Sequence, residues 1–247
     1  MPDKYTDVKQ MVLSIYAENK QRVGYRRITL ELKNKGIRIN HKTVQKLMRH
    51  LDLFCRVRMR KYHSYRGEVG NVVPNLLERN FEEDIPNQKW VTDITEFSMF
   101  GQKLYLSPIM DLYSRDIVSY TISNHPRFSL VTEMLEQAFQ KIPDNSNLIL
   151  HSDQGWHYQM KTYQQMLKTK GIRQSMSRKG NCLDNAVIEN FFGTLKSELL
   201  YLQHFASMEH FKREPFEYLN YYNNRRIKAK LKGLSPVQYG FQALRSA

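Results

Sequence analysis

The segment Trp90–Ser98, which reads Trp-Val-Thr-Asp-Ile-Thr-Glu-Phe-Ser, decides the fold of this chain. Its β-branched and aromatic residues predict a strand. Two similar runs follow at Lys103–Asp111 and Ile117–Ile122, each after a short turn. We therefore expect three consecutive antiparallel strands, of which the first lies at the centre of a sheet.

The residues after these strands alternate between helical and strand-like patterns. Apolar residues at helical spacing predict helices, and short apolar runs predict buried strands. The expected elements are a helix over 128–140, a strand at Leu148–Leu150, a helix at Tyr158–Lys170, a strand at Ile172–Met176 and a helix at Asp184–Leu200. This order predicts an α/β, ribonuclease-H-like fold, in which a mixed sheet is flanked by helices on both faces.

The front of the chain predicts a small all-α module. Helices are expected over 5–19, at Tyr25–Asn34 and at His41–Leu51, with Asn40 as the N-cap of the third. Three short helices with tight joints are typical of a helix-turn-helix module. The third helix has a polar face suited to a DNA groove, formed by Lys42, Gln45, Lys46 and Arg49. The alternative is a small helical bundle whose basic face is only solvated.

Composition divides the chain into three parts. We expect the helix-turn-helix module over residues 1–60, a linker over 61–85, and the α/β domain over 86–247 with a basic tail. The linker is inferred from its mixed composition, with several Gly and Pro residues. The basic cluster of the tail, which includes Arg226 and Lys228, is expected to contact phosphates. A solvated basic face is its rival.

Charge and cysteine content favour an intracellular DNA-binding protein. The 247 residues include 38 Lys and Arg against 24 Asp and Glu, a formal net charge of +14. Residues 1–70 hold 17 and 6 of these, a net of +11, and such an excess favours nucleic acid over a membrane. Cys55 and Cys182 are too few for a disulfide framework or a zinc pair. Since no bilayer-spanning run or signal peptide is evident, we expect a cytoplasmic location.

Three carboxylates occupy the predicted elements in ways that suit a shared site. Asp93 lies within the first strand, where Asp is depleted and where a bare carboxylate is costly to bury. Asp153 follows Leu148–Leu150, at the carboxyl end of a strand, where open α/β sheets place ligands. Glu189 flanks the apolar stripe of the last helix, whose expected N-cap is Asp184. Each also has an ordinary interpretation: an edge-strand Asp facing water, a turn Asp before Gly, and a boundary Glu.

Carboxylates that converge on one point repel each other, and divalent cations would resolve that repulsion. Two such ions, roughly 3.5–4 Å apart, clamp the attacking and leaving oxygens of a phosphoryl transfer. Hard oxygen ligands favour Mg²⁺ or Mn²⁺ over zinc. We therefore predict that Asp93, Asp153 and Glu189 are both the catalytic residues and the ligands of two ions.

Longer motifs carry a resemblance to a known family. Three motifs look like those of the DDE transposases of the IS-three insertion-sequence family. They are Trp-Val-Thr-Asp-Ile-Thr from residue 90, His-Ser-Asp-Gln-Gly from residue 151 and Asn-Cys-Leu-Asp-Asn-Ala-x-x-Glu from residue 181. They match its second-frame protein, OrfB. The same holds for the segments Gly24-Tyr25-Arg26-Arg27-Ile28, Leu195-Lys196-x-Glu198 and Tyr221-Tyr222-Asn223-Asn224-x-Arg226. The resemblance covers nearly the whole chain, and the catalytic domain of that family is similar to retroviral integrase.

The resemblance implies a DNA transposase, a polynucleotidyl transferase with the triad Asp93, Asp153 and Glu189 and with Lys196 touching DNA near the active site. It implies cleavage at the ends of the insertion sequence, strand transfer by the freed 3′-hydroxyl, and a homo-oligomer on the DNA. It further implies a partner reading frame, OrfA, as a fusion, and a bacterial, nucleoid-associated location. Pro215 departs from the family pattern, in which this position tends to carry an apolar residue. It also falls within Met208–Tyr222, a predicted helix that an internal proline would kink.

Two other functions are open from the sequence. A helix-turn-helix regulator without catalysis would have no need of three carboxylates in these contexts. A ribonuclease-H-like nuclease would share the metal ions and the triad, and fold alone does not exclude it. Strand joining distinguishes the transposase from both. DNA binding does not, because its affinity would fall steeply with salt in every case.

Overall fold

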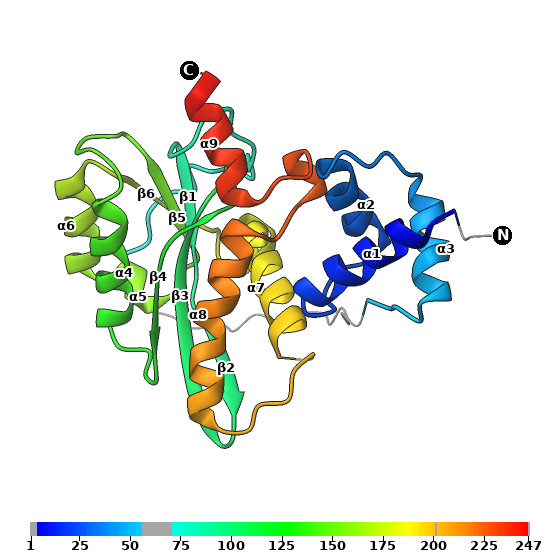
Figure 1. The fold of residues 1–247 in the computed structure, drawn as a ribbon. Helices are drawn as coiled ribbons and strands as arrows, with labels where there is room; N and C mark the ends of the chain where they lie inside the picture. The colour runs from blue at the N-terminus through cyan, green and yellow to red at the C-terminus, as the bar shows by residue number, and fades with distance from the viewer. Residues whose placement is uncertain (1–3, 56–70, 201, 247) are drawn as a thin grey trace.

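A helical N-terminal module lies beside an α/β domain in the computed structural model, which describes residues 4–55, 71–200 and 202–246 (Figure 1). The module consists of α1 (Thr6–Glu18), α2 (Tyr25–Asn34) and α3 (His41–His50), close to the predicted helices. These helices share a core that includes Val12, Ile28 and Val44. The Asn40 side chain caps α3 as predicted and accepts a hydrogen bond from the Lys42 amide at 2.9 Å. Residues 1–3 and 56–60 of the predicted module lie outside the described residues.

One mixed sheet forms the centre of the α/β domain. Its strands in the described part of the chain are β1 (Lys89–Thr92), β2 (Thr95–Met99), β3 (Gln102–Asp111), β4 (Ile117–Ser123), β5 (Ile149–Ser152) and β6 (Arg173–Met176). β3 is antiparallel to β1, β2 and β4, whereas β5 is parallel to both β1 and β6. β1 therefore lies at the centre, between the antiparallel and the parallel halves.

The predicted first strand is divided at Asp93. β1 and β2 lie along β3 in a single register, which sets Asp93 opposite Pro108. Proline has no amide hydrogen to give to a ladder. The carbonyl of Pro108 instead accepts a hydrogen bond from the Thr92 hydroxyl at 2.8 Å. The strand is thus interrupted at Asp93, which the sequence predicts to be catalytic.

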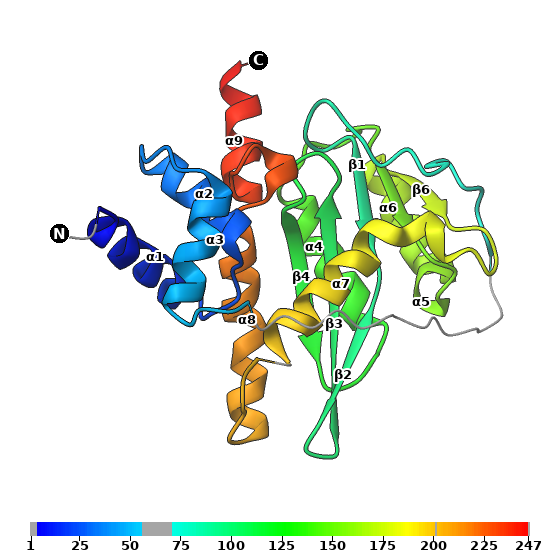
Figure 2. The same cartoon turned by 90° about the vertical axis from the view of Figure 1, so that its right-hand side faces the viewer.

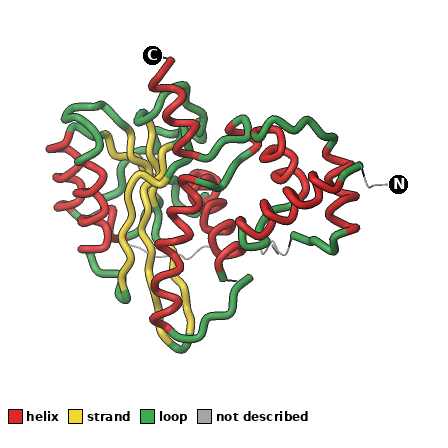
Figure 3. Tube along the Cα trace, viewed as in Figure 1, coloured by secondary structure: helices red, strands yellow, loops and turns green. Residues whose placement is uncertain are grey.

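Helices cover both faces of the sheet (Figures 2 and 3). The helices of the α/β domain are α4 (Ser129–Phe139), α5 (Trp156–Gln159), α6 (Lys161–Lys170), α7 (Ala186–Leu199), α8 (Met208–Asn224) and α9 (Pro236–Ser246). α4, α5 and α6 share one hydrophobic core with Trp90 of the sheet, and α7 and α8 share a second core with Phe97. The predicted helix Tyr158–Lys170 is divided, because Met160 adopts an extended conformation between α5 and α6.

Two parts of the α/β domain differ from simple expectation. α8 runs from Met208 to Asn224 as one helix, with the buried Pro215 inside it, so the proline does not end the helix. The predicted linker lies partly outside the described residues, but its second half packs on the domain. Leu77 is buried in the core with α7 and α8, and the Leu76 amide donates a hydrogen bond to Ser175 Oγ at 2.8 Å. Among the described residues, no helix is both long and apolar enough to cross a membrane.

Candidate active site

Asp93 and Asp153 come from adjacent parallel strands. β1 pairs with β5 so that Trp90 lies beside Leu150 and Val91 beside His151. Continued by two residues, that register brings Asp93 beside Asp153, where both strands end. The carboxyl edge of parallel strands is where such sheets bind ligands. The structure therefore brings together the two aspartates that the sequence predicted.

Glu189 reaches the same edge from α7. It lies in the first turn of the helix, partly buried on the flank of the stripe that includes Ile188 and Phe192. The start of α7 is tied to the end of β1 by a hydrogen bond from Asn185 Nδ2 to the Thr92 carbonyl at 3.2 Å. The helix therefore carries Glu189 toward the strand end that precedes Asp93.

The three carboxylates act on one another electrostatically. Burial, and then the charge of Asp153, raises the pKa of Asp93 well above its usual value of 3.8, and Glu189 adds a smaller effect of the same sign. Burial raises the pKa of Asp153. Burial and the charge of Asp153 raise the pKa of Glu189. The surroundings thus disfavour the charged forms of these carboxylates, chiefly through burial, and a bound cation would favour them.

The donor set fits a hard divalent cation in its chemistry, because all three side chains offer carboxylate oxygens. Within residues 4–55, 71–200 and 202–246, however, no group of three His, Cys, Asp or Glu is arranged to hold a metal ion. The charge of Asp153 raises the pKa of Asp93 more than that of Glu189 does.

A tight turn orients Asp153. The Gly155 amide donates a hydrogen bond to Asp153 Oδ1 at 2.8 Å. A Cβ atom at position 155 would stand 2.9 Å from that same oxygen, so a larger residue would displace the carboxylate. In the sequence, this Gly indicated only a turn, and its role as a support of Asp153 was missed.

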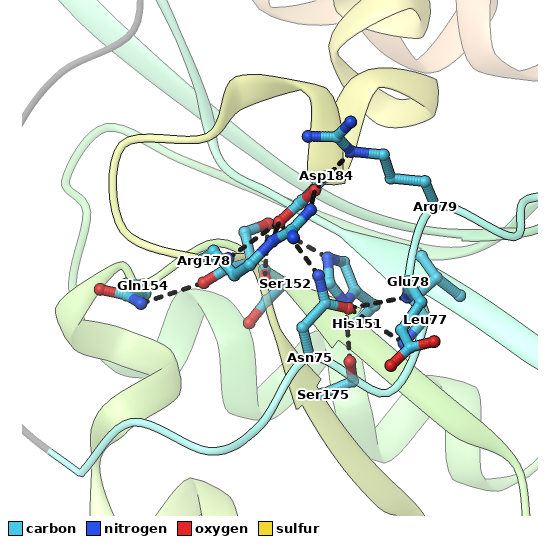
Figure 4. Close-up of polar contacts among 11 residues, drawn as sticks. Asn75, Leu77, Glu78, Arg79, His151, Ser152, Gln154, Ser175, Arg178 and Asp184 are labelled. Carbon is cyan, nitrogen blue, oxygen red and sulfur yellow. Dashed lines mark hydrogen bonds and ion pairs between the residues drawn. The ribbon is translucent and has the colours of Figure 1, made fainter.

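A buried carboxylate fixes the loop that leads into α7 (Figure 4). Asp184, expected as the N-cap of the helix, lies instead in a 3₁₀ turn, η1 (Cys182–Asn185). It accepts hydrogen bonds from Arg178 Nε and Nη2 and from Arg79 Nε, each at 2.9 Å, and from Asn75 Nδ2 at 3.0 Å. The hydrogen bonds from Arg178, followed by that from Arg79, lower the pKa of Asp184 far below its usual value although burial opposes them. The hydrogen bonds to Asp184 thus connect the loop between β6 and α7 to the segment before β1.

The histidines on either side of Asp153 have structural partners. His151 is buried with its ring nitrogens 2.8 Å from Ser175 Oγ and 3.1 Å from Ser177 Oγ. Burial lowers the pKa of His151 to about 4, so the ring is uncharged at neutral pH. His157 is also buried, and its Nε2 lies 2.8 Å from a backbone carbonyl. Contact of either ring with a metal or with DNA would need these partners to be given up.

Most of the side chains predicted to touch DNA are accessible. Lys42, Lys46 and Arg49 are exposed on α3, and Gln45 is partly exposed beside them. Lys196 is partly buried on α7, with its ammonium 5.7 Å from the centre of the Phe97 ring. Burial lowers the pKa of Lys196, while Glu96 and Asp93 act to raise it, so the ammonium lies within electrostatic reach of the site.

Arg226 and Lys228 are not surface cations, and the prediction that they contact phosphates is corrected. Arg226 is 8% exposed and donates from Nε and Nη2 to Glu198 at 2.8 and 2.7 Å. Lys228 Nζ lies 4.4 Å from the centre of the Tyr222 ring. Burial, and then the charge of Arg226, lowers the pKa of Lys228 to about 6. Both side chains are thus committed to internal contacts.

Family models and solved structures define the class of this protein. An integrase core domain model matches residues 83–182, a second integrase core domain model matches 189–244, and an HTH-like domain model matches 3–62. The HTLV-2 integrase catalytic core domain in complex with magnesium aligns with 63% of this chain and 97% of its own, in a dimeric form (TM-score 0.51, 18% identity) and a trimeric form (TM-score 0.50, 17% identity). The fold is therefore an integrase-type catalytic core joined to a helix-turn-helix module.

Relatives of known type define the family. The putative transposase InsK for insertion sequence element IS150 of Escherichia coli is 55% identical over 96% of this chain and 84% of its own length. The transposase InsF for IS3A of Escherichia coli is 38% identical over 93% and 80%, and the transposase for IS904 of Lactococcus lactis is 36% identical over 94% and 92%. The chain belongs to the IS-three (IS3) family of insertion-sequence transposases. It is a DDE-type DNA transposase that corresponds to OrfB.

Proposed function

We propose that Asp93, Asp153 and Glu189 are the catalytic triad of this DNA transposase and hold two Mg²⁺ or Mn²⁺ ions. The observation that carries the proposal is the register of β1 on β5, which leads both aspartates to one edge of the sheet. The raised pKa values of the three carboxylates support it, because burial disfavours their charged forms and a bound cation would favour those forms.

Ions bound there would lower the pKa of the attacking water or 3′-hydroxyl and stabilise the departing 3′-oxygen. The protein itself fixes the positions of the carboxylates that would hold these ions. The Gly155 amide orients Asp153, and the Ile94 amide donates a hydrogen bond to Asp93 Oδ1 at 2.7 Å. α7 carries Glu189 toward them. We expect Lys196 to contact a DNA phosphate as the strand enters the site, since its ammonium is within electrostatic reach of Asp93.

DNA binding follows from the family, and we propose that α3 is the element that enters the groove. Its exposed basic side chains support this assignment, and Lys42, Gln45, Lys46 and Arg49 are the proposed contacts. We further propose that the chain acts as a fusion with OrfA and as a homo-oligomer on the element ends and target DNA. Its correspondence to a second-frame protein supports the first point. Such a protein would work at the bacterial nucleoid in the cytoplasm.

A strand-transfer assay tests the triad. Purified chain and Mg²⁺ are combined with a duplex that ends in the terminal repeat flanking its own gene. We compare wild type with Glu189→Gln and with Glu136→Gln, an exposed carboxylate of α4. The proposal expects joined product from wild type and Glu136→Gln only. A near-normal rate from Glu189→Gln contradicts the triad, and cleavage without joining indicates a nuclease. If wild type is silent, the same comparison is made with the OrfA fusion.

A further inference from the structure

Arg27, Glu198 and Arg226 belong to three different motifs of the sequence and have no part in the proposed chemistry, yet they meet in one network around a buried carboxylate. Glu198 at the end of α7, with only 2% of its side chain exposed, is the centre. It accepts two hydrogen bonds from Arg226, one from Arg27 Nη2 at 3.1 Å and one from the Tyr218 hydroxyl at 2.9 Å. Arg27 belongs to α2 of the N-terminal module, whereas Tyr218 and Arg226 belong to α8 and the segment after it. The network therefore joins the module to the catalytic domain.

Further contacts extend this joint along the same side of the module. The Tyr221 hydroxyl donates to Asn19 Oδ1 at 3.0 Å, and Asn34 Nδ2 donates to the Gly233 carbonyl at 2.9 Å. The guanidinium of the buried Arg22 stands 5.6 Å from the centre of the Tyr221 ring. All these module residues lie on α2 or in the segment between α1 and α2. α3 is on the far side of the module from α7 and α8 (Figure 1), so the joint leaves it open to DNA.

The hydrogen bonds of the joint should fix the relative positions of its helices more than they stabilise the fold. A buried Arg-Glu-Arg triad is costly to desolvate, and it contributes little more than an apolar replacement of the same volume. Its hydrogen-bond directions, however, admit only one arrangement of the helices that supply them. α7 carries both Glu198 and Glu189, nine residues apart in one helix or about 14 Å along its axis. An element that fixes the module to Glu198 therefore also fixes it relative to Glu189.

We propose that the network centred on Glu198 positions the N-terminal module on α7. It thereby sets the spacing, in base pairs, between the DNA held by α3 and the phosphodiester that is cleaved. Glu198, Arg27 and Arg226 are positioning residues in this scheme, since they are committed to hydrogen bonds with one another. The statement about cleavage spacing rests on the proposed function. The fixed position of the module on α7 does not, because it can be measured in the protein without DNA.

The first test measures the joint without DNA. Arg27→Gln combined with Tyr221→Phe removes two links across the interface and leaves Glu198 paired with Arg226. Arg26→Gln combined with Tyr221→Phe is the matched control, since Arg26 is the exposed neighbour on the same helix. Spin labels are attached to cysteines introduced at His50 and Glu133, which are exposed on α3 and α4, after Cys55 and Cys182 are replaced by Ser. We expect a broadened distance distribution from the Arg27 variant, and an unchanged one would overturn the proposal.

The second test maps the cleaved phosphodiester, at nucleotide resolution, on the terminal-repeat duplex. It uses unlabelled protein in the fused form if that is the active one. We expect wild type and the Arg26 variant to cut at one position, and the Arg27 variant to cut at several neighbouring positions with a similar total. Broad distances with a single, unchanged cleavage position would overturn the proposal while leaving the transposase assignment intact. Absence of any cleavage by wild type would count against the proposed function, and the label distances would still decide the joint.

Discussion

Buried carboxylates behave in opposite ways at two places in this molecule. At the ends of α7, Asp184 and Glu198 each face two arginines, and hydrogen bonds and ion pairs hold the pKa of each below its usual value, that of Glu198 at about 2. At the end of β1, Asp93 and Asp153 face each other, and burial raises the pKa of both. The difference separates side chains that hold the fold from side chains that we propose as metal ligands. It predicts that equivalent substitutions will have opposite consequences at the two places.

Asp93→Asn should have the largest effect, and only on chemistry. Loss of a ligand carboxylate should lower the strand-transfer rate by about three orders of magnitude or more. Stability should not fall, because one of the mutually repelling charges is removed. The rate and the urea denaturation midpoint are measured for this variant beside Glu136→Gln. A marked loss of stability with retained activity would make Asp93 a structural residue.

Glu198→Gln, unlike Asp93→Asn, should lower the free energy of unfolding. It leaves Arg226 buried without its full counter-charge, and breaking such a pair costs about 3–5 kcal/mol. The loss should appear in the free energy of unfolding from urea denaturation at pH 7. The stabilising contribution of the Glu198 carboxylate is present above the unfolded pKa near 4.5 and is lost as the pH falls toward about 2. A decrease in the free energy of unfolding below about 1 kcal/mol would show that the Glu198–Arg226 pair is as weak as a surface ion pair.

Gly155→Ala should weaken catalysis without much effect on folding. Since the added Cβ would stand 2.9 Å from Asp153 Oδ1, the carboxylate must shift. A displacement of about 1 Å costs up to roughly 100-fold in rate, so we expect a loss of about 10- to 100-fold. Gly193→Ala on α7 is the control, since a Cβ there meets nothing within 4 Å. Equal rates for the two variants would show that the turn does not orient Asp153.

The smallest effect concerns the pH dependence of stability without metal. The pKa of Asp93 is raised in the folded protein, so its protonated form stabilises the fold below about 3.8 and that contribution is lost as the pH rises through the folded pKa. The wild type should therefore lose stability relative to Asp93→Asn at a slope of up to about 1.4 kcal/mol per pH unit above that value. Urea denaturation in EDTA at several pH values measures this. Added Mg²⁺ should remove the difference, and a flat difference in EDTA would contradict the raised pKa.

Local patterns in the sequence predicted most of the fold. The bounds of α2 and the order of the strands were read from apolar spacing, because each of those elements buries one face. The interruption of the first strand at Asp93 was missed, since it depends on Pro108 of a neighbouring strand. The role of Asp184 was missed for a related reason: its arginine Arg79 lies more than a hundred residues away and meets it only after folding.

The candidate site shows the same division between local and distant causes. Asp93 and Asp153 were found because each follows or interrupts a strand, and parallel strands end together. Arg226 was assigned to DNA because charge in a sequence says nothing about burial. Its partner Glu198 lies 28 residues earlier, and nothing in the tail itself indicates the pairing.

The burial of Arg226 and Lys228 bears on how this protein competes with counterions for DNA. Each phosphate neutralised by a side chain lowers the slope of log affinity against log salt by about 0.9. Arg226 is paired with Glu198, whose charge the formal net of +14 already counts, and burial lowers the pKa of Lys228 to about 6, so neither side chain adds much to the field that DNA meets. Counterions should therefore be displaced by the exposed cations of the N-terminal module and of the tail, and not by these two side chains. The salt dependence that the tail contributes should come from its exposed cations, Arg225, Lys230 and Lys232.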